Sequence, residues 1–472
     1  MSDLTGAVAA RPDACPGALR PHHAADGALV RIRLPGGRIS PQGLRALSDS
    51  ASRWGNGRLD ITGRGNIQLR GLDTAVLGRL AEVLRSAGML PSVTHERARN
   101  IVASPLSGLD AAGQVDLSPL VHELDQRLCA RPELSELGGR FLFGLDDGRG
   151  DILGLRADVS WCAIDPARGA LTFCGQDTGL RPTAAQACGV LVTAAVEFLR
   201  LRGGDPGVWR LRDLPGGADA LAAAVRAAVP TVARLDHRPT PGEGALPSPA
   251  APPTVGTVLR SGASQTSRAS AGSDGDPNPR STVTARVITP PLGRLTATQA
   301  HRLADLADLT ERAELADTTG APGDSGDSGA TDVEPGDRTG DHHARSLVVT
   351  PWRDIVLPGP AVGAEERLRE AGLVVDPESP WHGVSACAGI SGCAKSLTDV
   401  RADATRFVRL RTDPDTRTRV HWVGCSRRCG SPSTPHTAVV ATATDTYQID
   451  ATDSGVSAGD APARVAQALD SQ

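Results

Sequence analysis

Lysine is almost absent from this chain of 472 residues: Lys395 is the only one, although Lys and Arg together number 50. Aromatic residues are also scarce, at 3% of the chain, so the core must be built largely from Leu, Val, Ile and Ala. The net charge of −4 and the lack of a basic tract argue against a nucleic-acid partner. The length predicts two or three globular domains. The positive charges of these domains are almost all guanidinium groups.

Long apolar runs are missing as well. The most apolar segment, residues 188–201, is too short to cross a membrane and contains Glu197, so we expect a buried helix there and no membrane partner. Residues 1–13 are polar and lack the apolar centre of a signal peptide. Nine cysteines, an odd number, agree with a reducing compartment. We therefore expect a cytoplasmic protein.

Four of those cysteines form two pairs near the C-terminus. Cys387 and Cys393 are spaced C-x5-C, and Cys425 and Cys429 follow about thirty residues later as C-x3-C. Zinc sites usually use tighter knuckles, whereas a [4Fe-4S] cluster takes four thiolates and tolerates wider loops. Glycines at 389, 392, 424 and 430 would let the backbone approach a bulky group. The spacing favours an iron–sulfur cluster over zinc or over unligated core thiols.

The chain also contains an internal duplication. Residues 28–34 alternate as a strand, Ser40 and Pro41 mark the start of a helix, and residues 59–70 are expected to form a second strand. Residues 291–299 resemble 36–42, and residues 347–359 align with 59–71 without gaps. Two copies about 250 residues apart indicate a duplicated half-molecule.

The duplication and the composition together define expected domain boundaries. The first copy is expected at 15–78, an α/β domain at 79–235, the second copy at 285–362 and a last α/β domain at 363–472. Residues 236–284 are rich in Pro, Gly and Ser, which predicts a linker. The acidic, Gly-rich insertion at 318–343 is expected to be a disordered loop.

With these motifs, the chain resembles the sirohaem-dependent nitrite and sulfite reductase superfamily. The resemblance implies an α+β fold in which two ferredoxin-like half-domains pair and two α/β domains clasp sirohaem and a [4Fe-4S] cluster. It implies that Cys387, Cys393, Cys425 and Cys429 hold the cluster, and that Cys429 also bridges to the sirohaem iron.

The same resemblance implies which polar side chains bind the cofactor and which take part in the reaction. Residues 62–70 resemble the T-x-R-x-x-x-Q strand of that superfamily, with Asn66 and Arg70 expected on the same face as Arg64 and Gln68. Arg99 and Asn100 resemble part of its N-R-N segment. Guanidinium groups suit the carboxylates of a tetrapyrrole because they bind them bidentately. The expected cofactor-binding residues are therefore Arg64, Asn66, Gln68, Arg70, Arg99, Asn100 and Cys429, and the expected catalytic residues are Arg64, Arg99 and Arg140.

One departure favours a particular branch of the superfamily. Sulfite reductases have a basic pair near residues 140–142, but here Arg140 matches one member of the pair and Leu142 occupies the position of the other, which suggests a pocket with fewer cations. The motifs at 15–21, 33–37, 62–71, 141–151, 291–296 and 350–353 resemble the precorrin-3B synthase branch. That branch implies oxygen-dependent hydroxylation of precorrin-3A at C20 with closure of a γ-lactone, in aerobic cobalamin biosynthesis. Asp146 and Asp147 are candidates for proton delivery, although acidic residues beside a glycine more often form turns.

The partners follow from the same reasoning. They are a polycarboxylate tetrapyrrole, O2 and an external electron donor, a reductase or a ferredoxin, because no G-x-G-x-x-G follows a strand. Two other functions stay open: a sirohaem-dependent sulfite or nitrite reductase, and a zinc-stapled binding protein without redox activity.

Overall fold

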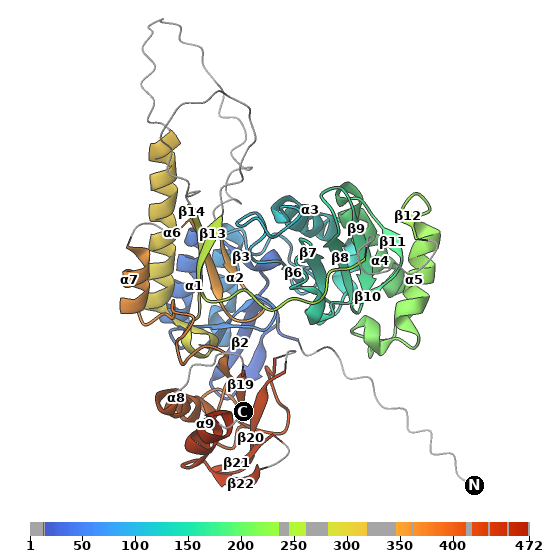
Figure 1. Cartoon of the computed structure of the whole chain (residues 1–472). Coiled ribbons are helices and arrows are strands. Elements are labelled where there is room, and N and C mark those ends of the chain that lie inside the picture. The colour runs from blue at the N-terminus through green and yellow to red at the C-terminus, as the bar shows by residue number, and fades with distance from the viewer. Residues whose placement is uncertain are drawn as a thin grey trace, which may run out of the picture.

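The computed structural model describes residues 13, 15–235, 245–260, 282–318, 346–359, 363–411, 418–432, 435–450 and 453–470. It mixes helices and sheets in an α+β arrangement of three parts. The two duplicated half-domains pack together at the centre, an α/β domain lies on one side of them, and the C-terminal domain lies below (Figure 1).

The first half-domain begins with the strand and helix that the sequence predicts. Ser40 caps its first long helix, because its hydroxyl accepts the Gly43 amide at 3.0 Å and Pro41 follows. Its elements are β1 (His22–Ala24), β2 (Gly27–Ile32), β3 (Arg38–Ile39), α1 (Pro41–Trp54), β4 (Arg58–Ile61), β5 (Ile67–Leu72) and α2 (Leu77–Ser86).

The single strand predicted at 59–70 is wrong: the segment is a hairpin of β4 and β5. The Thr62 hydroxyl accepts the amides of Arg64 and Asn66 and closes a turn over residues 62–66. Arg64 therefore lies in the turn, and only Gln68 and Arg70 share a face of β5. Sequence alternation could not reveal this, because the turn interrupts the period of two.

The second half-domain repeats this order, but it starts inside the segment expected to be a linker. Residues 256–260 form β13, which pairs with β14 in the sheet of this half-domain. Its elements are β13 (Gly256–Arg260), β14 (Thr282–Ile288), β15 (Arg294–Thr296), α6 (Ala297–Thr318), β16 (Leu347–Val349), β17 (Ile355–Pro358) and α7 (Ala364–Glu370). Most of the acidic insertion at 318–343 lies outside the described residues, as does much of the proposed linker.

The two half-domains exchange one short strand each. β15 of the second copy adds to the first sheet, whose order is β1-β2-β5-β4-β15, with Leu295 opposite Leu59. In return β3 of the first copy adds to the second sheet, β13-β14-β17-β16-β3, with Ile39 opposite Leu347. Helices α1 and α6 pack against each other, so the copies share one apolar core.

The middle α/β domain is built on a five-stranded sheet of order β10-β9-β8-β7-β6, with β6, β7 and β8 parallel. Its strands are β6 (Ile101–Ala103), β7 (Phe143–Asp146), β8 (Val159–Ala163), β9 (Gly169–Phe173) and β10 (Gln176–Asp177), with a separate pair β11 (Leu180–Arg181) and β12 (Ala233–Arg234). Its helices are α3 (Ser118–Cys129), α4 (Ala184–Arg202) and α5 (Gly217–Ala228).

Helix α4 contains the apolar segment noted in the sequence. Among the described residues it is the one helix long and apolar enough to cross a membrane by length and composition. Eight of its side chains are buried, and Leu191, Ala195 and Phe198 belong to the core of the middle domain. The packing is that of a core helix, as the sequence predicts.

The C-terminal domain has a five-stranded sheet of order β18-β19-β20-β21-β22, in which β18, β19 and β20 run parallel. Its elements are β18 (Val384–Ala386), α8 (Val400–Leu410), β19 (Val420–Val423), β20 (Thr437–Ala443), β21 (Thr446–Ile449), β22 (Asp453–Ser457) and α9 (Ala461–Asp470).

The shared core gives the first prediction. Leu303 of α6 is fully buried between the two copies, whereas Leu309 of the same helix is 39% exposed. Leu303→Ala is expected to lower the free energy of unfolding by about 2–5 kcal/mol, because it leaves a cavity in that core. Urea denaturation followed by circular dichroism measures this. Leu309→Ala is the matched control and should cost less than about 0.5 kcal/mol; equal losses would contradict a shared core.

Candidate functional site

The four paired cysteines lie together because of the parallel strands of the C-terminal domain. Cys387 directly follows β18, and Cys425 follows β19 after one glycine. Carboxyl ends of parallel neighbours meet at one edge of a sheet, so the two loops face each other. All four thiols line one cavity of about 760 Å³ between this domain and the first half-domain.

The four cysteines line one cavity, and their thiols influence one another's protonation. Burial and the nearby Cys387, Cys425 and Cys393 thiols raise the pKa of Cys429, so the four sulfurs interact electrostatically. Yet among the described residues no three metal-binding side chains converge closely enough to hold one ion. A structural zinc ion needs four ligands at about 2.0–2.3 Å from one centre. Four thiolates are the donor set that a [4Fe-4S] cluster takes, with one thiolate for each iron.

Arginines hold the cysteine loops through backbone carbonyls. Arg401 Nε donates to the Cys387 carbonyl at 2.9 Å, and Arg353 Nη2 donates to the Gly430 carbonyl at 2.7 Å. Arg70 donates to the Gly392 carbonyl and also binds both carboxylate oxygens of Asp26 at 3.0 Å. The loops are thereby fixed against both half-domains.

His421 adds a neutral support to the same region. Burial and the nearby Arg353 lower its pKa to about 3, so the imidazole is uncharged. Its Nδ1 accepts the Ser385 hydroxyl at 2.8 Å, and its Nε2 donates to the Cys429 carbonyl at 3.1 Å.

The glycines beside the cysteines leave room for neighbouring protein atoms. A β-carbon at Gly392 would lie 2.8 Å from Arg70 Nη2, and one at Gly424 would lie 1.9 Å from Ser396 Oγ. At Gly430 it would lie 2.8 Å from Arg353 Nη2, and at Gly389 it would meet Val400. Because these positions have no side chain, the neighbouring protein atoms pack directly against the loops that carry the thiols.

Across the cavity lies the polar face of β2 and β5. Gln68 Oε1 accepts Arg31 Nε and Nη2 at 3.1 and 2.7 Å, and both side chains line the cavity together with Arg70. Burial and the neighbouring Arg33 lower the pKa of Arg31 to about 10. The sequence analysis did not predict Arg31 as a site residue. The alternation of side chains along β2 could have indicated it, because Arg31 pairs with Gln68 in the register of β2 and β5.

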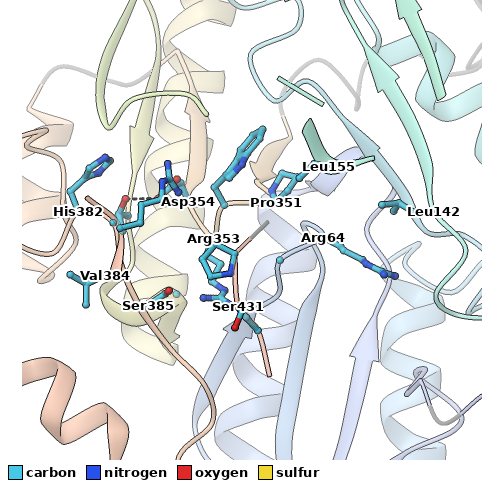
Figure 2. A pocket seen from close by; sticks show the side chains of 18 of the residues that line it. Arg64, Leu142, Leu155, Pro351, Arg353, Asp354, His382, Val384, Ser385 and Ser431 are labelled. Atoms are coloured by element: carbon cyan, nitrogen blue, oxygen red, sulfur yellow. Dashed lines mark hydrogen bonds between the residues drawn. The ribbon is translucent and has the colours of Figure 1, made fainter. Parts of the chain in front are cut away.

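A second, smaller cavity of about 300 Å³ adjoins the first. Arg64 and Leu142 lie on one side of it, and Asp354, His382 and Ser385 on the other (Figure 2). The two cavities share four lining residues, which are Gly63, Gly293, Arg353 and Gly430.

Comparisons with known proteins agree with this architecture. The family model of the nitrite/sulfite reductase ferredoxin-like half domain matches residues 20–87. A precorrin-3B synthase from Sinorhizobium sp. is 25% identical over 433 residues, covering 90% of this chain and 80% of that protein. A ferredoxin–nitrite reductase from Synechococcus elongatus is 34% identical, but over 29% of this chain and 28% of that protein.

These matches make the chain similar to the nitrite/sulfite reductase superfamily, and residues 20–87 carry its ferredoxin-like half domain. The solved structure of NirA from Mycobacterium tuberculosis has the same fold, with a TM-score of 0.65 and 16% identity, covering 94% of this chain and 80% of that one. The predicted fold class is confirmed.

Several side chains expected in the site lie outside both cavities. Arg99 is 3% exposed, and its Nε and Nη2 bind the Asp125 carboxylate at 2.6 and 2.7 Å. The Asn66 amide donates to the Asn100 side-chain carbonyl at 3.2 Å, in a buried network behind the turn. Arg140 is exposed and stacks on the Trp209 ring, 4.6 Å from its centre. These four side chains do not line the cavities.

The smaller cavity has more cations than Leu142 suggested. Burial, and then the charges of Arg210 and Arg33, lower the pKa of Arg64 to about 10. Arg210 directly precedes the short helix η5 (Leu211–Asp213) and lines the same cavity as Arg64. Arg210 is itself paired with Asp158 at 2.7 Å. Leu142 is buried, and the Trp352 indole packs against its apolar cluster. The wall is therefore apolar at Leu142 but not poor in guanidinium groups.

The acidic loop considered for proton delivery is a buried turn outside both cavities. Asp146 accepts the amides of Gly148, Gly150 and Ile152 at 2.9–3.0 Å, and Asp147 binds Arg149. This is the turn-forming role that the sequence analysis weighed against catalysis.

The same loop gives a pH prediction. Asp151 is 2% exposed; burial, and then the charge of Asp146, raise its pKa to about 7. From about pH 4 to 7 the folded protein therefore keeps a proton that the unfolded chain releases, so stability falls as pH rises through this window. Asp151→Asn should flatten that slope and be more stable than the wild type above pH 7.

Urea denaturation at a series of pH values measures the effect. Asp205→Asn, at an exposed position, is the control and should keep the wild-type slope. An unchanged slope in Asp151→Asn would contradict the assignment.

Proposed function

We propose that this protein is a precorrin-3B synthase. It would hydroxylate precorrin-3A at C20 with O2 and close the γ-lactone in aerobic cobalamin biosynthesis. The observation that carries the proposal is the extent of similarity: it covers 90% of this chain against the precorrin-3B synthase, but 29% against the nitrite reductase.

The thiol donor set supports a [4Fe-4S] cluster held by Cys387, Cys393, Cys425 and Cys429. Cys429 is the exposed thiol of the four, which fits a ligand that also bridges to a macrocycle iron. Sirohaem is the macrocycle we propose, because Arg31, Arg70 and Arg401 line the same cavity and suit its carboxylates. When bound, the two groups would supply single electrons and a centre for O2 chemistry.

The protein's own residues would bind, orient and exclude water. Arg31, held by Gln68, presents a cation to a tetrapyrrole carboxylate, and Arg64 does the same in the smaller cavity. Leu142 and Trp352 keep that wall dry. Burial raises the pKa of Asp354 to about 6, and its Oδ2 can hold a proton while its Oδ1 accepts the Thr289 hydroxyl.

Further parts of the proposal concern partners and location. The electron donor would be an external reductase or ferredoxin, since the sequence has no dinucleotide fingerprint. We propose a cytoplasmic location, because the cluster thiols require a reducing compartment.

A second candidate function is reduction of sulfite or nitrite. It is favoured by Arg210, which lies beside Arg64. Arg210 supplies a second cation in place of the basic residue that is missing at Leu142. Several converging cations are what a small oxyanion requires.

One assay separates the two functions. Anaerobically purified protein is given a reductant with precorrin-3A and O2 in one tube, and with sulfite or nitrite in another. We expect O2-dependent conversion of precorrin-3A. Consumption of the anion with precorrin-3A untouched would assign the protein to the reductases, and neither reaction in an iron-loaded protein would reject both.

A variant of Arg64 tests whether this arginine binds the tetrapyrrole. Arg64→Ala should weaken binding about 10- to 100-fold, the effect of losing a hydrogen bond to a charged group. Arg140→Ala, at an exposed position outside both cavities, is the control and should bind within about twofold of the wild type. Equilibrium titration of precorrin-3A under anaerobic conditions measures both, and equal losses would count against the assignment of Arg64.

A further inference from the structure

The same turn occurs once in each half-domain copy, at residues 62–66 and 350–354. In both, the threonine hydroxyl accepts two amides of the turn, at 3.1–3.4 Å. In both, the fourth residue is left-handed: Gly65 has φ 64° and Arg353 has φ 73°. Residues with a side chain rarely adopt this conformation, so the arginine stands where the duplicated turn favours glycine.

The Arg353 side chain lies in a slot between two glycines. A β-carbon at Gly293 would be 2.7 Å from Arg353 Cδ, and one at Gly430 would be 2.8 Å from Arg353 Nη2. Nη2 also donates to the Gly430 carbonyl at 2.7 Å. The aliphatic stem therefore lies against Gly293 and the guanidinium against Gly430, in a space that any larger residue at 293 or 430 would fill.

The equivalent position in the first copy has no such slot. A β-carbon at Gly65 would lie 2.7 Å from the Val349 carbonyl oxygen and 3.6 Å from Gly37 Cα. Backbone closes that turn completely. The copies thus differ where the second one faces the C-terminal domain and its cysteine loops.

The position of Arg353 connects the two cavities and the last cysteine. Arg353 and three glycines are the residues that line both cavities. Gly430 directly follows Cys429, whose own carbonyl accepts His421 Nε2. The Cys429 carbonyl is thus bound by His421, and the next carbonyl, that of Gly430, is bound by the Arg353 guanidinium.

We propose that Arg353 is a positioning residue that holds the Cys429 loop against the second half-domain and provides a fixed positive charge between the two cavities. The left-handed backbone directs the guanidinium toward the Gly430 carbonyl. The proposal does not depend on which substrate the protein uses.

Backbone hydrogen exchange of the full chain, read by mass spectrometry, tests the positioning. Arg353→Gly removes the side chain and the strained conformation together, so it should still fold. Its amides within 425–431 should exchange on the order of tenfold faster, as expected for the loss of one hydrogen bond to a charged group. Arg353→Lys, which can still donate to the Gly430 carbonyl, should restore most of the protection.

Arg156→Gly is the matched control. Arg156 is also a left-handed arginine, with φ 49°, but it is exposed and lines neither cavity. It should leave exchange within 425–431 unchanged. Wild-type exchange in Arg353→Gly, or the same acceleration in Arg156→Gly, would overturn the positioning role.

A reduction potential tests the charge. After anaerobic loading with ferrous iron and sulfide, Arg353→Gly should have a lower potential, because a nearby cation favours the more negative reduced state. Arg353→Lys should stay near the wild type, and Arg156→Gly should not differ from it. Equal potentials in all four proteins would overturn the electrostatic role. If the protein takes up no iron, the exchange experiment alone decides, and the cluster assignment fails separately.

Discussion

The exchange of β3 and β15 between the two half-domains is the constraint on which the rest of the structure depends. Each sheet is completed by a strand of the other copy, and α1 and α6 pack in one apolar core, so neither half can bury its core alone. The exchange fixes the turn at 62–66 and the turn at 350–354 relative to each other. The cavities then lie where these turns meet the middle and C-terminal domains.

From that framework the site is assembled by short backbone contacts. Parallel strands bring Cys387 and Cys425 to one edge, and arginines from both half-domains bind the carbonyls of their loops. Guanidinium suits this task because it gives several fixed donors and never loses its charge at neutral pH. Arginines hold the loops and line the cavities, and the only lysine, Lys395, lines the larger cavity with them.

The fold class, the duplication and the capped helix at Pro41 were predictable, because periodicity and repeated motifs record them directly. The gathering of the four cysteines followed from their spacing. The roles of Arg99, Asn66 and Asn100 did not, since a buried ion pair and a buried amide network leave no local pattern. Three further arginines that line the cavities were not predicted as site residues for a related reason: Arg31, Arg210 and Arg353. Each lies near other site residues that are distant in the sequence.

Anomalous diffraction from crystals of anaerobically purified protein, at the iron and zinc absorption edges, tests the central claim most directly. That claim is that the four cysteine thiols surround one polynuclear iron site opposite the Arg31 and Gln68 face. We predict iron density inside the larger cavity, within bonding distance of Cys387, Cys393, Cys425 and Cys429. Zinc alone at these thiols, or iron bound elsewhere with the four thiols free, would contradict it.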